Sequence, residues 1–416
     1  MAEHNRVRPR SAIVVGAGIV GLSTAWFLQE HGVSVTVVDR TGVAAGASRG
    51  NAGWIAPALS APLNDPRTLR IVLRSLPNRA APVRIPLSSD PTLWRFLMRF
   101  AINCRESSWT RAVQANLTLN HECMAAYDVL VSGGVDASIT EAPITALFRS
   151  TTEAERLLDQ LKRVGDAGQP SAITELTGAA LREQVPLASG AVAVGIRIEG
   201  QRFVDPGRFV HALGRAVVER GAALETVDVA DVRSSGHGVA VQPRSGAALT
   251  ADVAVIATGA WLPELVGSWV RVPVQAGRGY SFTVPVDRPV LGPIYLPDVR
   301  VACTPFRGKL RVTSVMELRR PEAPASAAVV DAIVDAAGLF FEGVRWADRD
   351  EVWVGARPLS PDGRPLVGPV ADNRVFVAGG HGMWGMKQGP VTGRLLAEQI
   401  VTGQQHAGLR DFDPLR

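Results

Sequence analysis

The amino-acid sequence predicts an α/β fold of mixed α+β character, in which a parallel sheet covered by helices is combined with a large mixed β-sheet. Three observations predict this fold. The chain has 416 residues, enough for two domains or two interleaved lobes. Residues 11–39 read in order as a strand, a glycine-rich turn, a helix and a second strand. Residues 272–286 and 309–318 alternate as strands of a sheet with one buried face do.

The composition excludes several classes of protein. Hydrophobic residues make up 46% of the chain and charged residues 20%, which is typical of a globular protein and not of a disordered one. The net charge is +5, but no run of five basic residues occurs, so we expect no binding to nucleic acid. The three cysteines, Cys104, Cys123 and Cys303, show no close pairing. They predict neither disulfides nor a metal site, and they indicate a reducing, intracellular setting.

Residues 11–39 contain the motif that decides the fold. Ser11–Val15 is a β-branched run that predicts a buried strand, Ile19–Glu30 reads as a helix, and the next strand ends at Asp39. Between the first strand and the helix stand three glycines in G-x-G-x-x-G spacing, Gly16, Gly18 and Gly21. In this motif the first glycine permits a tight turn, the second lets the backbone approach a diphosphate, and the third lets the helix pack closely on the strand.

The same motif predicts a bound dinucleotide. The helix N-terminus faces the diphosphate, and Asp39 is placed to accept hydrogen bonds from ribose hydroxyls. A solvated acid at a strand end is the alternative for Asp39. No second glycine fingerprint occurs in the chain, so one dinucleotide is expected, and the glycines alone do not distinguish FAD from NAD.

Five further segments carry motifs beyond the glycine turn. They are residues 46–66 with GASRGNAGW, 199–232 with DPGRF, 251–265 with ATGAW, the strand pair 272–286 and 309–318, and 351–400 with GARP and GGHG. Together with the glycine turn they resemble the D-amino-acid oxidase superfamily of FAD-dependent oxidoreductases, and most closely its bacterial D-amino-acid dehydrogenase branch. The resemblance covers nearly the whole chain and implies FAD as the cofactor.

The resemblance also implies a division into domains. It implies a Rossmann-type FAD-binding domain of the glutathione-reductase/D-amino-acid-oxidase kind, and an interleaved substrate domain built on a large mixed β-sheet. The expected FAD-binding domain comprises residues 1–60, 190–270 and 345–416, and the expected substrate domain comprises 61–189 and 271–344.

The family pattern assigns a set of residues to the cofactor. The residues expected to contact FAD are Gly16, Ala17, Gly18, Ile19, Val20, Gly21, Asp39, Arg40, Ser48, Asn51, Ala52, Gly53, Val229, Ala257, Thr258, Gly259, Trp261, Gly380, His381, Gly382, Gly385, Met386 and Lys387. A plain Gly/Ala/Ser loop near residue 50 and a core strand near Val229 are the alternatives. Some relatives attach flavin covalently through a cysteine beside the position of Arg357. This chain has Ala356 there, so we expect non-covalent FAD.

The helix that closes the chain is expected to aim its N-terminus at the flavin. Lys387 stands in its first turn, and we expect its ammonium to favour the anionic reduced flavin. A solvated helix lysine is the alternative. His381 is expected in the pocket, or as a residue that shapes the Gly-Gly-His-Gly turn.

The resemblance further suggests a substrate site. The arginine of the G-x-R-P pattern binds the substrate carboxylate in the family, which gives this role to Arg357, although a structural arginine is the alternative in so arginine-rich a chain. The catalytic candidates are Arg357, Tyr280 and His381, and the pocket candidates are Trp54, Trp384 and Glu317. For Tyr280 and Glu317 the alternatives are a strand aromatic and a solvated edge acid.

The activity that the resemblance implies is oxidative deamination of D-amino acids, by hydride transfer from Cα to flavin N5, giving a 2-oxo acid and ammonia. The neutral amine supplies the electrons, so the protein has to orient and desolvate the substrate. Two alternatives stay open: oxidation of a secondary or cyclic amine such as hydroxyproline, sarcosine or glycine, and a non-catalytic flavin-binding subunit of a larger oxidoreductase. The electron acceptor is oxygen or a quinone.

Two segments bear on localisation. The N-terminal apolar run is broken by glycines and fits neither a signal peptide nor a spanning helix, so we expect a cytoplasmic protein. Residues 91–109 predict a helix with an apolar stripe and neighbouring arginines. The stripe is Trp94, Leu97, Met98 and Ala101, and the arginines are Arg95, Arg99 and Arg105. The helix indicates peripheral contact with the inner face of a membrane, or simply packing on the substrate sheet.

Overall fold

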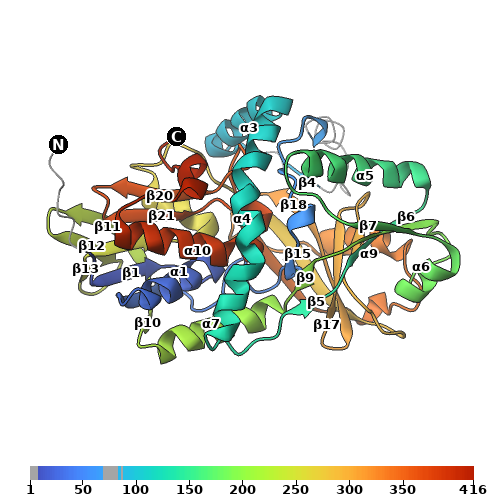
Figure 1. Cartoon of the computed structure of the whole chain (residues 1–416), viewed down its shortest axis with the longest axis horizontal. Helices are drawn as coiled ribbons and strands as arrows, with labels where there is room; N and C mark the ends of the chain where they lie inside the picture. The colour runs from blue at the N-terminus through green and yellow to red at the C-terminus, as the bar shows by residue number, and fades with distance from the viewer. Residues whose placement is uncertain (1–7, 69–82, 86–87) are drawn as a thin grey trace.

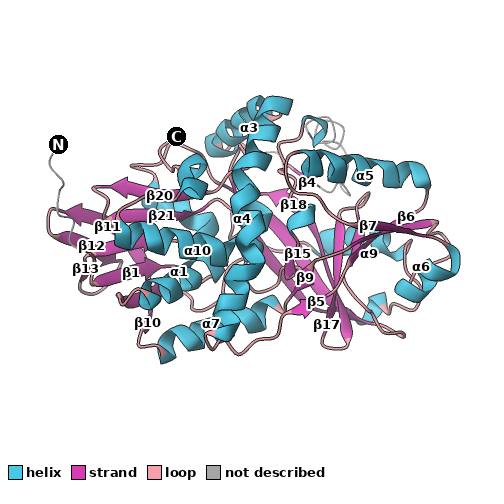
Figure 2. Cartoon of the chain, viewed as in Figure 1, coloured by secondary structure: helices cyan, strands magenta, loops and turns pink. Residues whose placement is uncertain are grey.

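The computed structural model describes residues 8–68, 83–85 and 88–416 and contains two large sheets. Figure 1 shows one large sheet at each end of the molecule, with the long helix α4 (Glu106–Ser132) running across between them. The mixed α/β architecture expected from the sequence is confirmed. Figure 2 shows that most strands gather in these two sheets while helices cover them.

The first large sheet has six strands in the order β10, β2, β1, β14, β21 and β20. Their bounds are Ala223–Thr226 for β10, Ser34–Asp39 for β2, Ser11–Val15 for β1, Val253–Ile256 for β14, Val375–Gly379 for β21 and Leu366–Ala371 for β20. The first five strands run parallel, and β20 is antiparallel to β21. β14 and β21 are buried along their whole length, as strands covered on both faces are.

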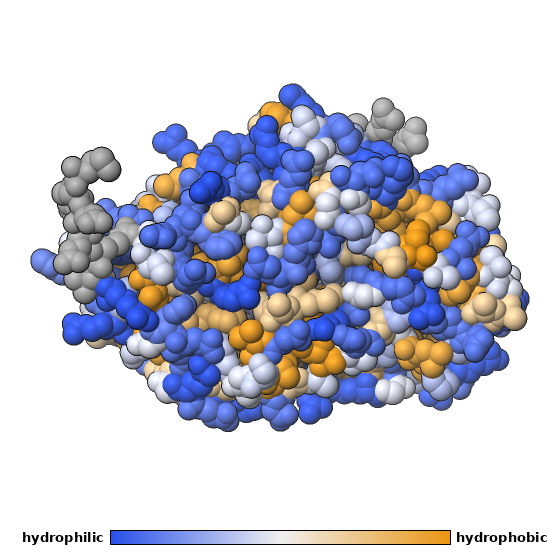
Figure 3. Space-filling view, viewed as in Figure 1, coloured by the Kyte–Doolittle hydropathy of each residue, from blue (hydrophilic) through white to orange (hydrophobic). Residues whose placement is uncertain are grey.

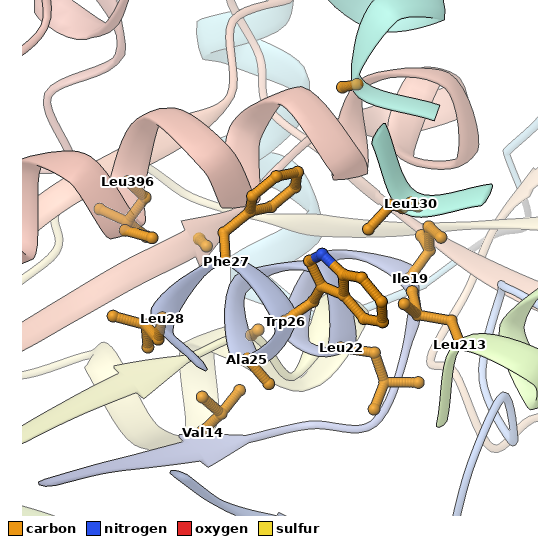
Figure 4. Close-up of a cluster of buried hydrophobic side chains, with 14 of the residues drawn as sticks. Val14, Ile19, Leu22, Ala25, Trp26, Phe27, Leu28, Leu130, Leu213 and Leu396 are labelled. Atoms are coloured by element: carbon orange, nitrogen blue, oxygen red, sulfur yellow. The ribbon is translucent and has the colours of Figure 1, made fainter. Parts of the chain in front are cut away.

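Helices cover one face of this sheet. They are α1 (Ile19–Glu30), α7 (Pro206–Glu219) and α10 (Gly385–Thr402), and they pack with α4 into one apolar core. Figure 4 shows Trp26 and Phe27 of α1 among side chains that include Leu396 of α10. A Cβ on Gly393 would lie 2.6 Å from the Thr24 nitrogen, so glycine lets α10 approach α1 closely. Both helices therefore begin at the same edge of the sheet.

The opposite face is covered by a small antiparallel sheet and a short helix. The sheet consists of β11 (Val229–Ser235), β12 (Gly238–Pro243) and β13 (Leu249–Ala251), and the helix is α8 (Leu262–Val266). Their apolar side chains join those of β1, β14 and β21 in a second core. The central strands β1, β14 and β21 are thus covered on both faces, whereas the edge strand β10 is exposed.

The second large sheet is mixed and has nine described strands. Their order is β19, β15, β18, β17, β16, β6, β8 and β7, with β4 paired to β18. Their bounds are Asp350–Leu359 (β19), Gln275–Pro285 (β15), Lys309–Leu318 (β18), Val301–Phe306 (β17), Ile294–Leu296 (β16), Ile144–Phe148 (β6), Val194–Ile198 (β8), Ile173–Leu176 (β7) and Val83–Arg84 (β4). Helix α9 (Ala327–Gly338) packs on this sheet through an apolar core.

Shorter elements complete the described chain. The remaining helices are α3 (Pro91–Asn103), α5 (Thr151–Asp166) and α6 (Gly178–Gln184), with 3-10 turns η1 (Pro57–Leu59), η2 (Gly259–Trp261), η3 (Trp346–Asp348), η4 (Gly382–Trp384) and η5 (Ala407–Phe412). A second small sheet joins β3 (Trp54–Ile55), β9 (Arg202–Phe203) and β5 (Thr140–Glu141). None of the described helices is apolar over a stretch long enough to cross a membrane.

Two features differ from what the sequence suggested. β8 and β19 belong to the nine-stranded sheet, although residues 190–270 and 345–416 were assigned to the FAD-binding domain. β15 is buried on both faces rather than one, because α9 covers one side and side chains of β19 cover the other. The reason is that β15 lies at the junction of two lobes, where other elements cover both of its faces. The alternation of residues along one strand does not show which elements pack on it.

Candidate functional site

A cavity lies where the six-stranded sheet meets the edge strand of the nine-stranded sheet. It is lined by the carboxyl ends of β1 and β2, by the residues after β14, by the first residues of α1 and α10, and by β19. In open α/β sheets, ligands bind outside the carboxyl ends of parallel strands. The cavity is therefore the candidate site for both cofactor and substrate.

The glycine turn between β1 and α1 forms one wall of this cavity. Gly16 has φ +116° and donates its N–H to the Val38 carbonyl at 2.7 Å. A Cβ on Gly21 would overlap the Gly16 carbonyl oxygen, so the third glycine lets α1 pack onto the turn. A Cβ on Gly18 would meet only Ser48 Oγ at 3.2 Å, and Gly18 lines the cavity. The second glycine thus leaves the backbone open to a ligand.

The carboxylate of Asp39 organises the glycine turn. Its Oδ2 accepts a hydrogen bond from the Ala17 N–H at 2.9 Å, and its Oδ1 accepts from the N–H groups of Thr41 and Gly42. Asp39 also lines the cavity. Because each carboxylate oxygen can accept two hydrogen bonds, Oδ2 keeps one acceptor position for a ligand hydroxyl.

The loop after β2 is held in place by its own side chains. Ser48 Oγ accepts a hydrogen bond from the Ile19 N–H at 3.1 Å, in the first turn of α1. Asn51 donates to the Ala47 carbonyl and accepts from the Gly53 N–H at 2.8 Å. Ser48 and Asn51 both line the cavity, so this loop closes it on a second side.

The turn after β14 presents a polar atom without a partner. The Thr258 hydroxyl is buried and has no hydrogen-bond partner among the described residues, and it lines the cavity. Gly259 follows with φ +59°, which turns the chain into η2. At the cavity rim the Arg40 guanidinium stacks 4.2 Å from the Trp261 ring. An unpartnered buried hydroxyl costs free energy, which a bound ligand would recover.

The first turn of α10 and the residues before it close the cavity on a third side. Gly380 and Gly382 have φ of +72° and +56° and hold His381 between them. His381 is buried, and its Nε2 lies 3.0 Å from Thr392 Oγ1. Burial lowers the pKa of His381 to about 4, so its imidazole is neutral at neutral pH. The neighbouring Met386 also lines the cavity, at the N-terminus of α10.

Arg357 brings a positive charge into the cavity from β19. Its Nη1 donates a hydrogen bond to the Val315 carbonyl at 2.8 Å. Burial lowers the pKa of the guanidinium to about 10, and no carboxylate of the described residues opposes this change. Among the described residues, no aspartate or glutamate forms an ion pair with Arg357, whereas the buried Arg278 pairs with Glu317 at 2.9 Å. A partly buried cation without a counter-charge favours an anionic ligand.

Trp353 is a cavity residue that the sequence interpretation missed. Trp353, Gly355 and Arg357 alternate along β19 and share one face of the strand. A Cβ on Gly355 would overlap the Trp353 indole, so glycine lets the ring lie against the strand. The spacing of two residues from Arg357 was the signal that could have identified it.

The cavity brings together most of the residues that the sequence singled out. Those that line it are Gly16, Gly18, Ile19, Val20, Asp39, Arg40, Ser48, Asn51, Val229, Ala257, Thr258, Gly259, Trp261, Arg357, His381, Gly382, Gly385 and Met386. Those outside its lining are Ala17, Gly21, Ala52, Gly53, Gly380, Lys387, Tyr280, Glu317, Trp54 and Trp384. Several of the residues outside the lining belong to the turns that position the lining residues.

The positions of Tyr280 and Glu317 correct the expectation that they line the pocket. Both are buried, and the Tyr280 hydroxyl donates to Glu317 Oε2 at 3.1 Å. Tyr280 packs in the core beneath α9. Successive strand residues face opposite sides, and the neighbouring Gly279 faces the Arg357 guanidinium, so Tyr280 points away from it. Glu317 is only 3% exposed, so it is not a solvated edge acid either.

Trp54 and Trp384 contact groups outside the cavity. The Trp54 indole N–H donates to Thr304 Oγ1 at 2.8 Å, and its ring meets Tyr295 edge to face at 5.9 Å. The ring of Trp384 lies 4.9 Å from the Lys387 ammonium. Both indoles therefore pack between elements that surround the cavity.

The position of Lys387 differs from both earlier interpretations. Its side chain is buried, with 1% of the residue exposed, so it is not a solvated helix lysine. Its Nζ donates to Asn120 Oδ1 of α4 at 2.6 Å and to Ser60 Oγ, and Lys387 is absent from the cavity lining. Burial lowers the pKa of the ammonium to about 7. Lys387 thus joins α10 to α4 and to the segment after η1.

Comparison with known families identifies the family of this chain. A family model described as "FAD dependent oxidoreductase" (DAO) matches residues 11–399. The chain therefore belongs to the DAO family of FAD-dependent oxidoreductases, and it is an enzyme that acts on an amine or amino acid with FAD as cofactor. This result argues against the alternative of a non-catalytic flavin-binding subunit.

Two relatives of similar length share one name. A protein named D-amino acid dehydrogenase from Vibrio vulnificus strain YJ016 is 29% identical over 426 residues, which span 97% of this chain and 99% of the relative. Another of that name from Agrobacterium fabrum strain C58 is 26% identical over 96% of this chain and 97% of the relative.

Solved structures support the fold. Glycine oxidase from Geobacillus kaustophilus has a TM-score of 0.74 at 22% identity, over 98% of this chain and 99% of that one. Iminodiacetate oxidase from Chelativorans sp. BNC1 has a TM-score of 0.72 at 19% identity, over 97% and 98% of the two chains.

The cavity has the chemistry that FAD requires. The open backbone at Gly18 and the N-terminus of α1 suit a diphosphate, and the free acceptor position on Asp39 suits a ribose hydroxyl. The unpartnered Thr258 hydroxyl adds a hydrogen-bonding group at the same cavity. These residues, with the N-terminus of α10, would hold the cofactor.

Replacing Gly18 by valine should weaken FAD binding while leaving the fold intact. The valine side chain would point past Ser48 into the cavity, whereas the packing of α1 relies on Gly21. We expect the dissociation constant of FAD to rise by at least about tenfold, on the scale of one lost charge-assisted hydrogen bond. Quenching of flavin fluorescence measures the constant. An unchanged constant in a variant with the wild-type apoprotein melting temperature would contradict the assignment.

Lys387→Met should change how stability depends on pH. The folded-state pKa of about 7 lies below the ordinary lysine value, so between these values the unfolded chain binds the extra proton. The free energy of unfolding of the wild type should therefore rise as the pH goes from about 7 to about 10. Lys387→Met should remove that rise and stabilise the protein at pH 7.

Urea unfolding at a constant concentration of free FAD measures this effect. Lys309→Met, at a lysine that is partly exposed and lies 3.5 Å from Asp350, is the control and should keep the wild-type pH dependence. If Lys387→Met also keeps it, the buried ammonium is not the group responsible.

Proposed function

We propose that this protein oxidatively deaminates D-amino acids to 2-oxo acids and ammonia. The single observation that carries the proposal is the partly buried guanidinium of Arg357, which lines the cavity and forms no ion pair with a carboxylate among the described residues. It suits the α-carboxylate that every amino acid presents. The full-length similarity to proteins named D-amino acid dehydrogenase supports the choice of substrate.

The task of the protein's own residues is to orient the substrate. When bound, FAD supplies an acceptor for the hydride that leaves the substrate Cα. Among the described residues, Nη1 of Arg357 donates to the Val315 carbonyl and contacts Met316 Sδ, so the N–H groups of Nη2 and Nε are left for a carboxylate. With the carboxylate fixed, only one enantiomer presents its Cα hydrogen in the reactive direction. This constraint is the physical origin of a preference for one hand.

Of the groups around the proposed carboxylate site, Arg357 supplies the positive charge. His381 is neutral at neutral pH because of its burial, so it adds no charge beside the substrate. Trp353, on the same face of β19 as Arg357, contributes an apolar wall that excludes water. The substrate amine reacts in its neutral form, so a base at Cα is not required.

Oxidation of a secondary or cyclic amine is the second candidate. The structures similar in fold include one named glycine oxidase and one named iminodiacetate oxidase. Hydroxyproline, sarcosine and glycine also carry a carboxylate, so Arg357 would serve them equally. The two candidates share the carboxylate and differ in the amine group of the substrate.

Anaerobic reduction of the FAD-loaded protein separates these candidates. We expect D-amino acids such as D-alanine to bleach the flavin absorbance faster than their L-enantiomers, glycine, sarcosine or hydroxyproline. Faster bleaching by glycine or a secondary amine would replace the first candidate by the second. Repeating the reaction in air with peroxide detection tells whether oxygen accepts the electrons, and added quinone tests the other acceptor.

Replacing Arg357 by methionine should raise KM for amino acids by about 10- to 100-fold while FAD stays bound. The expected loss corresponds to one charge-assisted hydrogen bond, at about 1.5 to 3 kcal/mol. Arg307→Met is the control, because Arg307 is exposed and pairs with Asp205 outside the cavity. Wild-type KM values in Arg357→Met would show that another group binds the carboxylate.

We also infer that α3 contacts an anionic membrane surface. Its Leu93 and Phe96 are buried in a cluster with residues of β18 and β19, so one face packs on the large sheet. Three other side chains, one turn apart, are exposed: Trp94 by 52%, Met98 by 62% and Ile102 by 57%. Figure 3 shows hydrophobic residues reaching the surface over α3, at the top of the view.

The charges beside this stripe favour lipid as its partner. Arg95 and Arg99 flank the stripe and both donate to the Arg271 carbonyl. A helix with exposed apolar residues, a tryptophan and flanking arginines is typical of the interface of anionic bilayers. The exposed stripe differs from the one read from the sequence, since Leu97 packs against the buried cluster.

The triple variant Trp94→Ser, Met98→Gln, Ile102→Gln should lose binding to anionic vesicles. We expect the wild type to co-sediment with phosphatidylglycerol vesicles and not with phosphatidylcholine vesicles, and the triple variant with neither. Leu291→Gln is the control, since Leu291 is 58% exposed but lies outside α3. Failure of the wild type to bind phosphatidylglycerol vesicles at low salt would exclude the membrane contact.

A further inference from the structure

The guanidinium of Arg357 is held by backbone rather than by an acidic side chain. Its Nη1 donates to the Val315 carbonyl at 2.8 Å and lies 3.9 Å from Met316 Sδ. Its flat face lies on Gly279 of the neighbouring strand β15, where a Cβ would overlap Cζ and both Nη atoms. The arginine is thus fixed without any partner that would neutralise it.

The Val315 carbonyl is available because β18 contains a bulge. Glu317 pairs with Arg278 and Ser314 pairs with Tyr280, so two residues of β18 oppose the single residue Gly279. Within the bulge Val315 has φ +67°, a left-handed conformation that β-branched residues rarely adopt. Such a conformation persists only where the surrounding structure imposes it, and it is enriched at functional sites.

Two paired glycines leave room for side chains that line the cavity. Gly279 pairs with Gly355 between β15 and β19. The absence of a side chain at Gly279 admits the Arg357 guanidinium, and its absence at Gly355 admits the Trp353 indole. A planar cation and a planar aromatic ring therefore both lie close to the sheet and line the cavity above it.

We infer that Gly279 and the Val315 bulge are positioning residues that set how deeply a substrate carboxylate binds. Because Gly279 has no side chain, the guanidinium lies directly against the sheet. One end of it donates to the Val315 carbonyl, so that the remaining N–H donors face the cavity. The inference rests on the proposed function, because it assumes that Arg357 binds the carboxylate. A role in packing alone would affect stability but would not distinguish carboxylates from neutral ligands.

The test compares two glycines on the same strand. Gly279→Ala places a methyl group against the Arg357 guanidinium, whereas Gly277→Ala places one against Met316 and Leu359. Both positions are buried and lie on the same face of β15. Gly277→Ala is therefore a control for steric crowding that meets the arginine only through Met316, whose sulfur lies 3.9 Å from Nη1.

The probes are benzoate and its neutral analogue benzamide, bound to the FAD-loaded protein and followed through the flavin absorbance spectrum. For Gly279→Ala we expect benzoate to bind at least about tenfold more weakly than to the wild type, with benzamide binding unchanged. With the substrate found in the anaerobic screen, KM should rise while kcat stays within a few-fold. For Gly277→Ala we expect a lower melting temperature and the wild-type ratio of the two dissociation constants.

Val315→Gly supplies an independent variant should Gly279→Ala not fold. Glycine adopts positive φ freely and keeps the carbonyl, so this variant should retain benzoate affinity within about twofold. Equal effects of the two alanine variants on the benzoate-to-benzamide ratio, or tenfold weaker benzoate binding in Val315→Gly, would overturn the inference. A wild type that binds neither benzoate nor amino acids would instead refute the proposed function.

Discussion

The close approach of backbone to backbone at the β1–α1 turn is the constraint on which the rest of the structure depends. A Cβ on Gly16 would lie 2.5 Å from the Ala257 carbonyl oxygen, and one on Gly21 would overlap Gly16 itself. Three segments, β1, α1 and the turn after β14, therefore meet with nothing between them. Since α10 also packs on α1 through Gly393, two helix N-termini reach one cavity. The positive ends of their helix dipoles favour an anion in that cavity.

Two cations that form no ion pair among the described residues, the partly buried Arg357 and the buried Lys387, distinguish this molecule from an ordinary arginine-rich protein. Many of its arginines pair with carboxylates, and even the buried Arg278 has Glu317. Arg357 and Lys387 instead donate to neutral oxygens of Val315, Ser60 and Asn120, and burial lowers the pKa of both. Charges of this kind reduce the stability of the folded chain. Arg357 faces the cavity, where an anion would compensate it, whereas Lys387 lies behind the cavity wall and ties α10 to α4.

Local sequence patterns predicted the elements that depend on neighbours along the chain. The strand Ser11–Val15 and the helix Ile19–Glu30 have the predicted bounds, because β-branched runs and glycine spacing act within a few residues. Asp205 and the proline after it begin α7, as the DPGRF motif suggested. The same reasoning failed for Tyr280 and Glu317. Alternation identifies two faces of a strand, but which face meets the cofactor lobe depends on how the two sheets are joined.

The sequence by itself determined the class of fold, the cofactor and the glycine turn that would receive it, since these follow from short-range spacing and from motifs that a whole family shares. Only the tertiary structure decided which face of β15 and β19 meets the cavity, and hence that Arg357 and Trp353 lie there while Tyr280 does not. It alone revealed the bulge at Val315 and the burial of Lys387. The physical reason is that strand register and burial arise from contacts between residues far apart in the chain.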